Sequence, residues 1–157
     1  MDSQGDKESY ASFTVYSRTR SAEELTELFP VAPNRSWQKG ARLYKNPVTP
    51  AGKDPRHVHR VSGISFESRL GRTVDPEAHI DDLLRRLSPA KDALRAFAQR
   101  ARVEDPETKT PLYLRLVVLT TRAEIGFDFP DEMMEAISDM GAHLGLELEF
   151  DDEAPDE

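Results

Sequence analysis

The chain has 157 residues, of which 38% are hydrophobic and 32% charged, and its net charge is −8 at pH 7. A chain of this length can bury a hydrophobic core as one domain without support from disulfides or metal ions. It contains no cysteine, which excludes disulfides, thiolate nucleophiles and cysteine-bound zinc. The longest apolar run covers only residues 116–119, and the polar, acidic start does not match a signal peptide. We therefore expect a cytoplasmic protein.

Charge is distributed unevenly along the chain. Residues 35–60 carry seven basic side chains and one acidic side chain, whereas residues 123–157 carry thirteen acidic side chains and no basic one. This asymmetry indicates either electrostatic steering of a partner or attraction between the two segments within the fold. The sequence leaves both interpretations open.

The first part of the chain predicts one strand and one short helix. Residues 1–10 lack apolar periodicity, so we expect a disordered N-terminus. Ala11, Phe13 and Val15 alternate with polar or amphipathic side chains, which predicts a half-buried strand. The Ser-Ala-Glu-Glu segment at 21–24 matches a capping box that opens a helix, and prolines end that helix soon afterwards.

Residues 31–60 form the longest stretch without a clear pattern. Four prolines and two glycines lie there among few apolar side chains. We expect a long basic loop, with a brief strand at 42–44 as its only regular structure. A loop of this length in a compact domain is typical of a binding element or of a disordered segment.

The middle of the chain predicts a strand and two helices. Residues 61–70 alternate as a strand does. An aspartate followed by proline then opens a helix over 76–87, whose leucines and isoleucine recur on one face. Ser88-Pro89 repeats the same start, which favours a second helix over 89–102; a single kinked helix is the alternative.

The last third predicts three strands and one helix. Residues 112–119 are apolar on both faces, as in a central strand, and residues 124–129 are expected to form a hairpin with them. A helix starts after Pro130, and a strand over 146–150 follows it.

This final strand has two unlike faces. Leu146, Leu148 and Phe150 alternate with Glu147 and Glu149. A period of two places the apolar side chains on one face and the carboxylates on the other. We expect the apolar residues to face the core and the glutamates to form an acidic strip that receives a basic partner.

The order of elements predicts an α+β fold with a mainly antiparallel sheet and helices packed on one face. A ferredoxin-like β-α-β-β-α-β core with an appended β-α-β unit fits this order. A single domain would cover residues 11–151, and residues 152–157 would form an acidic tail. No repeat with a solenoid period is present.

No catalytic motif emerges from the sequence, which lacks the glycine spacing of phosphate loops and a complete nucleophile elbow. His57 and His59 would share one face of an extended segment, but two ligands do not make a zinc site. We favour solvated histidines. We therefore expect no catalytic residue, no metal site and no cofactor, and a metal-dependent enzyme is the weakest alternative.

The basic segment supplies one group of candidate binding residues. Trp37 is the single tryptophan, and Lys39 and Arg42 lie close to it in sequence. An aromatic ring among cations can stack on a base, a sugar or a peptide. It can equally anchor the loop to its own sheet, which is the interpretation we favour.

Arg115 is the other candidate. It lies in the middle of an apolar strand, where a guanidinium needs a carboxylate. Glu147 or Glu149 can provide one if the two strands are neighbours. We favour a structural ion pair over a ligand site.

Several of these patterns together resemble a known bacterial family. They are the helix start at 21–25, the Trp-Gln-Lys-Gly segment at 37–40, the strand at 62–70, the helix at 79–87 with the Ser-Pro after it, and Met-Gly-Ala at 140–142. Over residues 11–151 the chain resembles the family of domains of unknown function numbered 4279 (DUF4279). The resemblance implies a small, single-domain cytoplasmic protein without recognised catalytic residues.

These observations favour a non-enzymatic protein that binds another protein, such as an immunity-type or regulatory module. The missing catalytic constellation and the acidic C-terminal face motivate this hypothesis. Binding of nucleic acid by the basic loop at 35–60 is the alternative, although a net charge of −8 opposes it. Neither hypothesis involves a membrane.

Overall fold

The computed structural model describes residues 7–41, 58–72, 75–120 and 128–150. The elements in chain order are β1 (Lys7–Ser17), α1 (Ala22–Glu27), β2 (Arg35–Trp37), β3 (Ser62–Glu67), α2 (Pro76–Leu87), the 3₁₀ helix η3 (Ser88–Ala90), α3 (Lys91–Glu104), β4 (Leu112–Thr120), α4 (Asp131–Asp139) and β5 (His143–Phe150).

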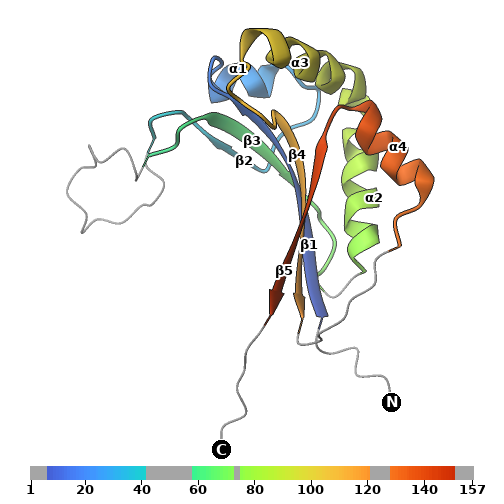
Figure 1. The fold of residues 1–157 in the computed structure, drawn as a ribbon. Helices are drawn as coiled ribbons and strands as arrows, with labels where there is room; N and C mark the ends of the chain where they lie inside the picture. The colour runs from blue at the N-terminus through green and yellow to red at the C-terminus, as the bar shows by residue number, and fades with distance from the viewer. Residues whose placement is uncertain (1–6, 42–57, 73–74, 121–127, 151–157) are drawn as a thin grey trace, which may run out of the picture.

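The strands form one five-stranded sheet in the order β2-β3-β1-β4-β5. All neighbours are antiparallel except β4 and β5, which are parallel. Figure 1 shows the helices on one face of this curved sheet, while the described elements leave the other face uncovered. The predicted α+β fold with a mainly antiparallel sheet is confirmed, and the narrower ferredoxin-like comparison stays a prediction.

The core lies between the sheet and the helices, as the alternation of side chains requires. Phe13 and Val15 of β1 and Leu114 of β4 point toward the helices and are fully buried. Ile80, Leu83 and Leu87 of α2 meet them from the other side, spaced so that they share one helical face. Leu84 belongs to the same predicted apolar face of α2, but it is only partly buried against this core.

Three helix ends coincide with signals in the sequence. The hydroxyl of Ser21 accepts a hydrogen bond from the amide of Glu24 at 3.1 Å, as in a capping box. Pro76 occupies the first turn of α2, where a missing amide hydrogen costs nothing. At the end of α4, Gly141 has a φ of +73° and its amide bonds to the carbonyl of Ser138. This left-handed glycine stops the helix and turns the chain into β5.

The two-helix prediction for the middle of the chain is confirmed. α2 ends at Leu87, and Pro89 lies in the 3₁₀ turn that precedes α3. Proline cannot continue the amide ladder of α2, so the chain changes direction here. Over the described residues, no helix is long and apolar enough to cross a membrane.

Two boundaries predicted from the sequence are wrong. β1 begins at Lys7, so residues 7–10 belong to a strand and not to a disordered N-terminus. β2 lies at 35–37, inside the segment predicted as loop, because β3 offers an antiparallel edge there. The brief strand predicted at 42–44 and the acidic tail at 152–157 lie outside the described residues.

The prediction for the end of the chain is partly wrong. The strand predicted at 124–129 lies mostly outside the described residues, and 128–130 form no strand. Leu146 and Leu148 point to the helix side, as expected, because they align with Leu116 and Val118. They are nevertheless 47% and 46% exposed, since β5 is the end strand of the sheet.

Candidate functional site

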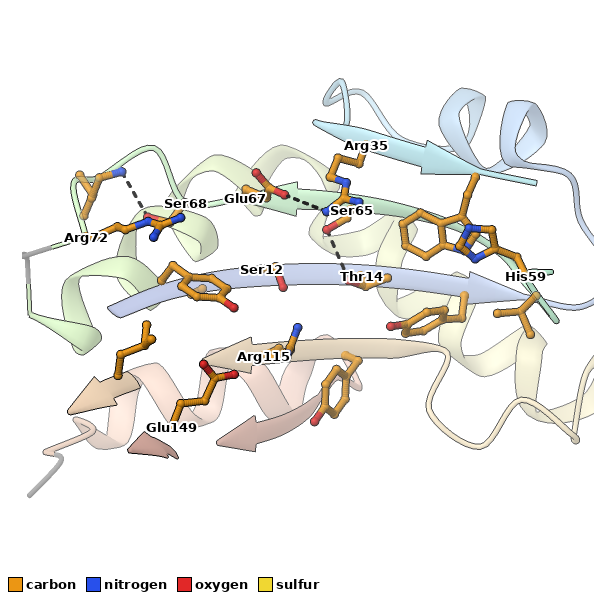
Figure 2. A pocket seen from close by; sticks show the side chains of 18 residues that line it. Ser12, Thr14, Arg35, His59, Ser65, Glu67, Ser68, Arg72, Arg115 and Glu149 are labelled. Atoms are coloured by element: carbon orange, nitrogen blue, oxygen red, sulfur yellow. Dashed lines mark hydrogen bonds and ion pairs between the residues drawn. The ribbon is translucent and has the colours of Figure 1, made fainter. Parts of the chain in front are cut away.

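The uncovered face of the sheet holds a groove with a volume of about 850 Å³. Figure 2 shows that side chains from β1, β2, β3 and β4 project into it. We call this feature the sheet groove and define it by these residues: Tyr10, Ser12, Thr14, Tyr16, Arg35, Trp37, His59, Ser65, Glu67, Ser68, Arg72, Tyr113, Arg115 and Glu149.

Small side chains make the floor of the sheet groove. Ser12 and Thr14 lie on the central strand β1, and Ser65 lies beside them on β3. The hydroxyl of Thr14 donates to that of Ser65 at 3.5 Å. Larger side chains on the flanking strands rise above this floor, which is why the face is hollow.

The aromatic end of the groove centres on Trp37. The indole stacks on the imidazole of His59, with centroids 5.5 Å apart, and meets the Tyr16 ring edge-on at 6.1 Å. Gly63 lies directly under the indole, so a Cβ at this position would overlap the ring. Trp37 therefore fastens β2 and the segment around His59 to the sheet, which confirms the anchoring interpretation, while it also lines the groove.

A second aromatic residue also lies over a glycine, on the opposite side of the groove. The Tyr113 hydroxyl covers Gly145 of β5, and a Cβ there would overlap it. Tyr113 and Tyr16 are both half-buried. These rings fill the space that a side chain would take at Gly63 of β3 and Gly145 of β5, and they present flat surfaces to the groove.

Carboxylates accompany the arginines of the groove. Arg35 lies 3.9 Å from Glu67, and Arg72 lies 3.6 Å from Glu8. These exposed pairs contribute little to stability. The guanidinium of Arg72 also lies 6.0 Å from the centre of the Tyr10 ring, at the limit of a cation–π contact.

Arg115 makes the firmest ion pair of the groove. Its Nε donates to Glu147 Oε2 at 2.9 Å, and its Nη2 donates to the same oxygen. This hydrogen bond raises the pKa of Arg115 above its ordinary value, and partial burial acts in the opposite direction. The predicted structural ion pair is therefore confirmed. It can form because β4 and β5 are parallel neighbours.

The remaining predicted binding residues are not gathered in one place. Glu149 lines the groove. Lys39 is exposed outside it, where its amide bonds to the hydroxyl of Ser62 at 2.9 Å. Arg42 and His57 lie outside the described residues. Burial and the nearby Arg35 lower the pKa of His59.

Ser68 and the buried His79 form the only serine–histidine pair that the described residues place within hydrogen-bonding distance. The Ser68 hydroxyl lies 2.8 Å from Nδ1 of His79, and Nε2 of His79 is buried without a hydrogen-bond partner. The amides of Arg69 and Leu70 are already bonded, to Asp82 and to Ser68 itself. Acyl transfer requires a group that orients the histidine and free amides that stabilise an oxyanion. In the described part of the chain, no group bonds to Nε2 of His79, and these two amides are not free.

Burial also decides the charge state of His79. It lowers the pKa of the imidazole below 6.5, although the nearby Asp82 acts in the opposite direction. The neutral form is therefore favoured in the fold. Within the described ranges, no cluster of three or more potential ligands could hold a metal ion.

Replacing Gly63 by valine is expected to displace Trp37. The new side chain occupies the space of the indole, and such overpacking costs about 1–3 kcal/mol in the free energy of unfolding. Because Trp37 is the only tryptophan, its fluorescence emission should shift to longer wavelength as the ring becomes more hydrated. Gly71→Val is the control, since open space surrounds Gly71. An unchanged emission maximum in Gly63→Val would contradict the stacking.

Sequence reasoning missed much of the groove. Tyr10, Tyr16 and Tyr113 are ordinary strand formers, so their presence on one face carried no separate signal. Arg35 and Arg72 lie in or near segments predicted as loops. The alternation around Ser12 could have identified the open face, because residues of the same parity on β1 share it.

Comparison with known proteins gives one match. A family model described as a domain of unknown function (DUF4279) matches residues 7–151. No curated protein and no solved structure matches the chain. Since this match covers every strand and helix that the structure describes, the chain belongs to the DUF4279 family.

Proposed function

We propose that this protein is a non-enzymatic binding module that holds a segment of another protein in the sheet groove. The observation that carries the proposal is the composition of the groove, where a tryptophan, three tyrosines and three arginines surround a hydroxyl floor. Tryptophan, tyrosine and arginine are the residues that most often dominate binding energy at protein interfaces. Half-buried rings already held in place lose little entropy when a partner covers them.

The dimensions of the groove suit an extended chain segment. From Tyr10 to Tyr16 along β1 the floor spans about 20 Å, given a rise of roughly 3.3 Å per residue. Apolar side chains of such a segment would contact the aromatic end, and polar side chains would meet the floor. Such binding would suit a regulatory or immunity-type role in a bacterial cytoplasm.

The charges of the groove favour a protein over a nucleic acid. Arg35, Arg72 and Arg115 each lie beside a glutamate, and Glu149 adds a further negative charge. Binding of a phosphate backbone requires cations that are free to replace counterions. The aromatic rings could stack on bases, but these glutamates would repel the phosphates.

Filling the groove provides the test. Ser12→Tyr adds a large side chain to the floor without touching the core, and tyrosine is a good strand former. Random peptides displayed on phage would be selected for binding to the wild-type protein. The affinity of the selected peptides would then be measured for the wild type and for the variant. We expect a loss of about tenfold or more, because the ring blocks the groove.

Ser36→Tyr is the matched control for this experiment. Ser36 is exposed on β2 and alternates with Arg35 and Trp37, so its side chain lies on the other face of the sheet. The control should bind the selected peptides as the wild type does. Equal binding by Ser12→Tyr, or preferential binding of single-stranded RNA over every selected peptide, would refute the proposal.

A further inference from the structure

The two edges of the sheet differ in length. β2, at one edge, contains only three residues, Arg35–Trp37. β5, at the other edge, contains eight, His143–Phe150, and among the described residues it pairs with β4 alone (Figure 1). Proteins commonly protect a long edge strand with lysine, proline or a bulge, because its free amides and carbonyls can pair with another chain. β5 contains neither lysine nor proline.

The side chains of β5 give this edge a specific chemistry. Leu146 and Leu148 lie on the helix side of the sheet and remain about half exposed. Glu147 and Glu149 lie on the groove side. Glu147 binds Arg115, whereas no cation among the described residues lies within ion-pair distance of Glu149. The edge is therefore apolar on one face and acidic on the other.

We propose that β5 receives an added strand from a partner protein whose side chains alternate between apolar and basic. This inference rests on the proposed protein-binding function but uses the sheet edge instead of the groove. Side chains opposite each other in adjacent strands share a face. The apolar side chains of the partner would cover Leu146 and Leu148, and its lysines or arginines would face Glu149 and Glu147. Backbone hydrogen bonds along the edge would provide affinity, as in other cases of strand addition.

A second copy of this chain is a poorer occupant of the edge. Antiparallel pairing of two β5 strands would place the glutamates of both copies on one face, and like charges on adjacent strands are destabilising. β5 contains no arginine or lysine that could offset them. The acidic face therefore favours a partner of opposite charge.

A capped, fluorescent peptide of sequence Lys-Val-Lys-Val-Lys-Val-Lys is the probe, and fluorescence anisotropy with the full chain is the readout. Two further peptides carry N-methyl groups, one on the valine amides and the other on the internal lysine amides. Alternate amides of a strand point to opposite sides, so only one of these two sets can pair with β5. We expect one methylated peptide to bind about tenfold more weakly or worse, and the other to bind nearly as well as the parent. Equal binding of all three peptides would overturn the inference, because it would show adsorption by charge alone.

Variants of the protein locate the probe. Leu148→Lys places a cation against the apolar face of the peptide and should weaken binding about tenfold. Met134→Lys is the matched control, because Met134 is similarly exposed, at 41%, but lies on α4. Ser12→Tyr should leave probe binding unchanged. Loss of binding in Ser12→Tyr but not in Leu148→Lys would overturn strand addition while supporting the groove. A wild-type dimer in sedimentation that Leu148→Lys dissociates would also overturn the inference, in favour of a second copy.

Discussion

Phe13→Ala is expected to lower the free energy of unfolding by about 3–5 kcal/mol. Phe13 is fully buried on β1, the central strand of the sheet, between β3 and β4. Its register partners Phe66 and Leu114 are buried as well, so the helix layer cannot easily collapse into the space that the ring leaves. A large cavity in a rigid part of the core therefore remains. Urea denaturation followed by circular dichroism would measure the loss.

Val103→Ala is the control for this core substitution. Val103 lies near the end of α3 and is 82% exposed. Its truncation should change the free energy of unfolding by less than about 0.5 kcal/mol, as is usual for surface positions. A similar loss in both variants would mean that the assignment of the core face is wrong.

Acidification is expected to destabilise the protein through His79. Burial lowers the pKa of this imidazole below its ordinary value of 6.5. In the unfolded chain His79 binds a proton as the pH falls through that ordinary value, whereas in the fold it stays neutral until a lower pH. The contribution of His79 to the free energy of unfolding is therefore fully present above the ordinary pKa. This contribution decreases as the pH falls below that value. One such group changes stability by at most about 1.4 kcal/mol per pH unit.

His79→Leu isolates this contribution. Other groups, carboxylates among them, also respond to acid, so the informative quantity is the difference in unfolding free energy between wild type and variant. As the pH falls from about 7 to about 5, we expect the wild type to lose more unfolding free energy than the variant does. Only the wild type must keep a buried imidazole neutral. Parallel pH profiles of the two proteins would show that His79 is not the group responsible. A growing advantage of the wild type at low pH would mean that the sign is wrong.

The helices could be predicted from the sequence because their signals are local. Pro76 fixes the start of α2, and the recurrence of Ile80, Leu83 and Leu87 defines its buried face. The strand around Phe13 was equally predictable from a period of two. Its start at Lys7 was not, because pairing with Thr120 on β4 and not a local pattern holds that end.

Depth of burial and the short strand could not be predicted. The alternation around Leu146 indicates which side of the sheet a residue faces, but it does not show that β5 is the end strand. β2 has three residues, too few for any period. It pairs with the edge of β3, and Trp37 packs over Gly63 across this strand pair. Nothing local to either residue indicates this long-range contact.

The candidate site was predictable only in part. Trp37 is a candidate as the single tryptophan, Arg115 as a cation in an apolar strand, and Glu149 as part of the acidic strip. Each of these three residues lines the groove. Lys39 is a candidate because it is a cation close to Trp37 in sequence, but it is not among the residues that line the groove. The tyrosines were overlooked because a groove is a property of neighbouring strands, and the order of strands becomes known only from the structure.

The central position of β1 bears on how the chain folds during synthesis. β1 precedes all the strands that it pairs with, and its Val15 pairs with Leu112, about a hundred residues later in the chain. Until β4 emerges, one edge of this apolar strand has no native neighbour. Closing so long a loop before any contact compensates for its entropy makes folding slow. The nascent chain should therefore depend on chaperones that shield β1, and truncation before β4 should yield aggregates instead of a smaller folded unit.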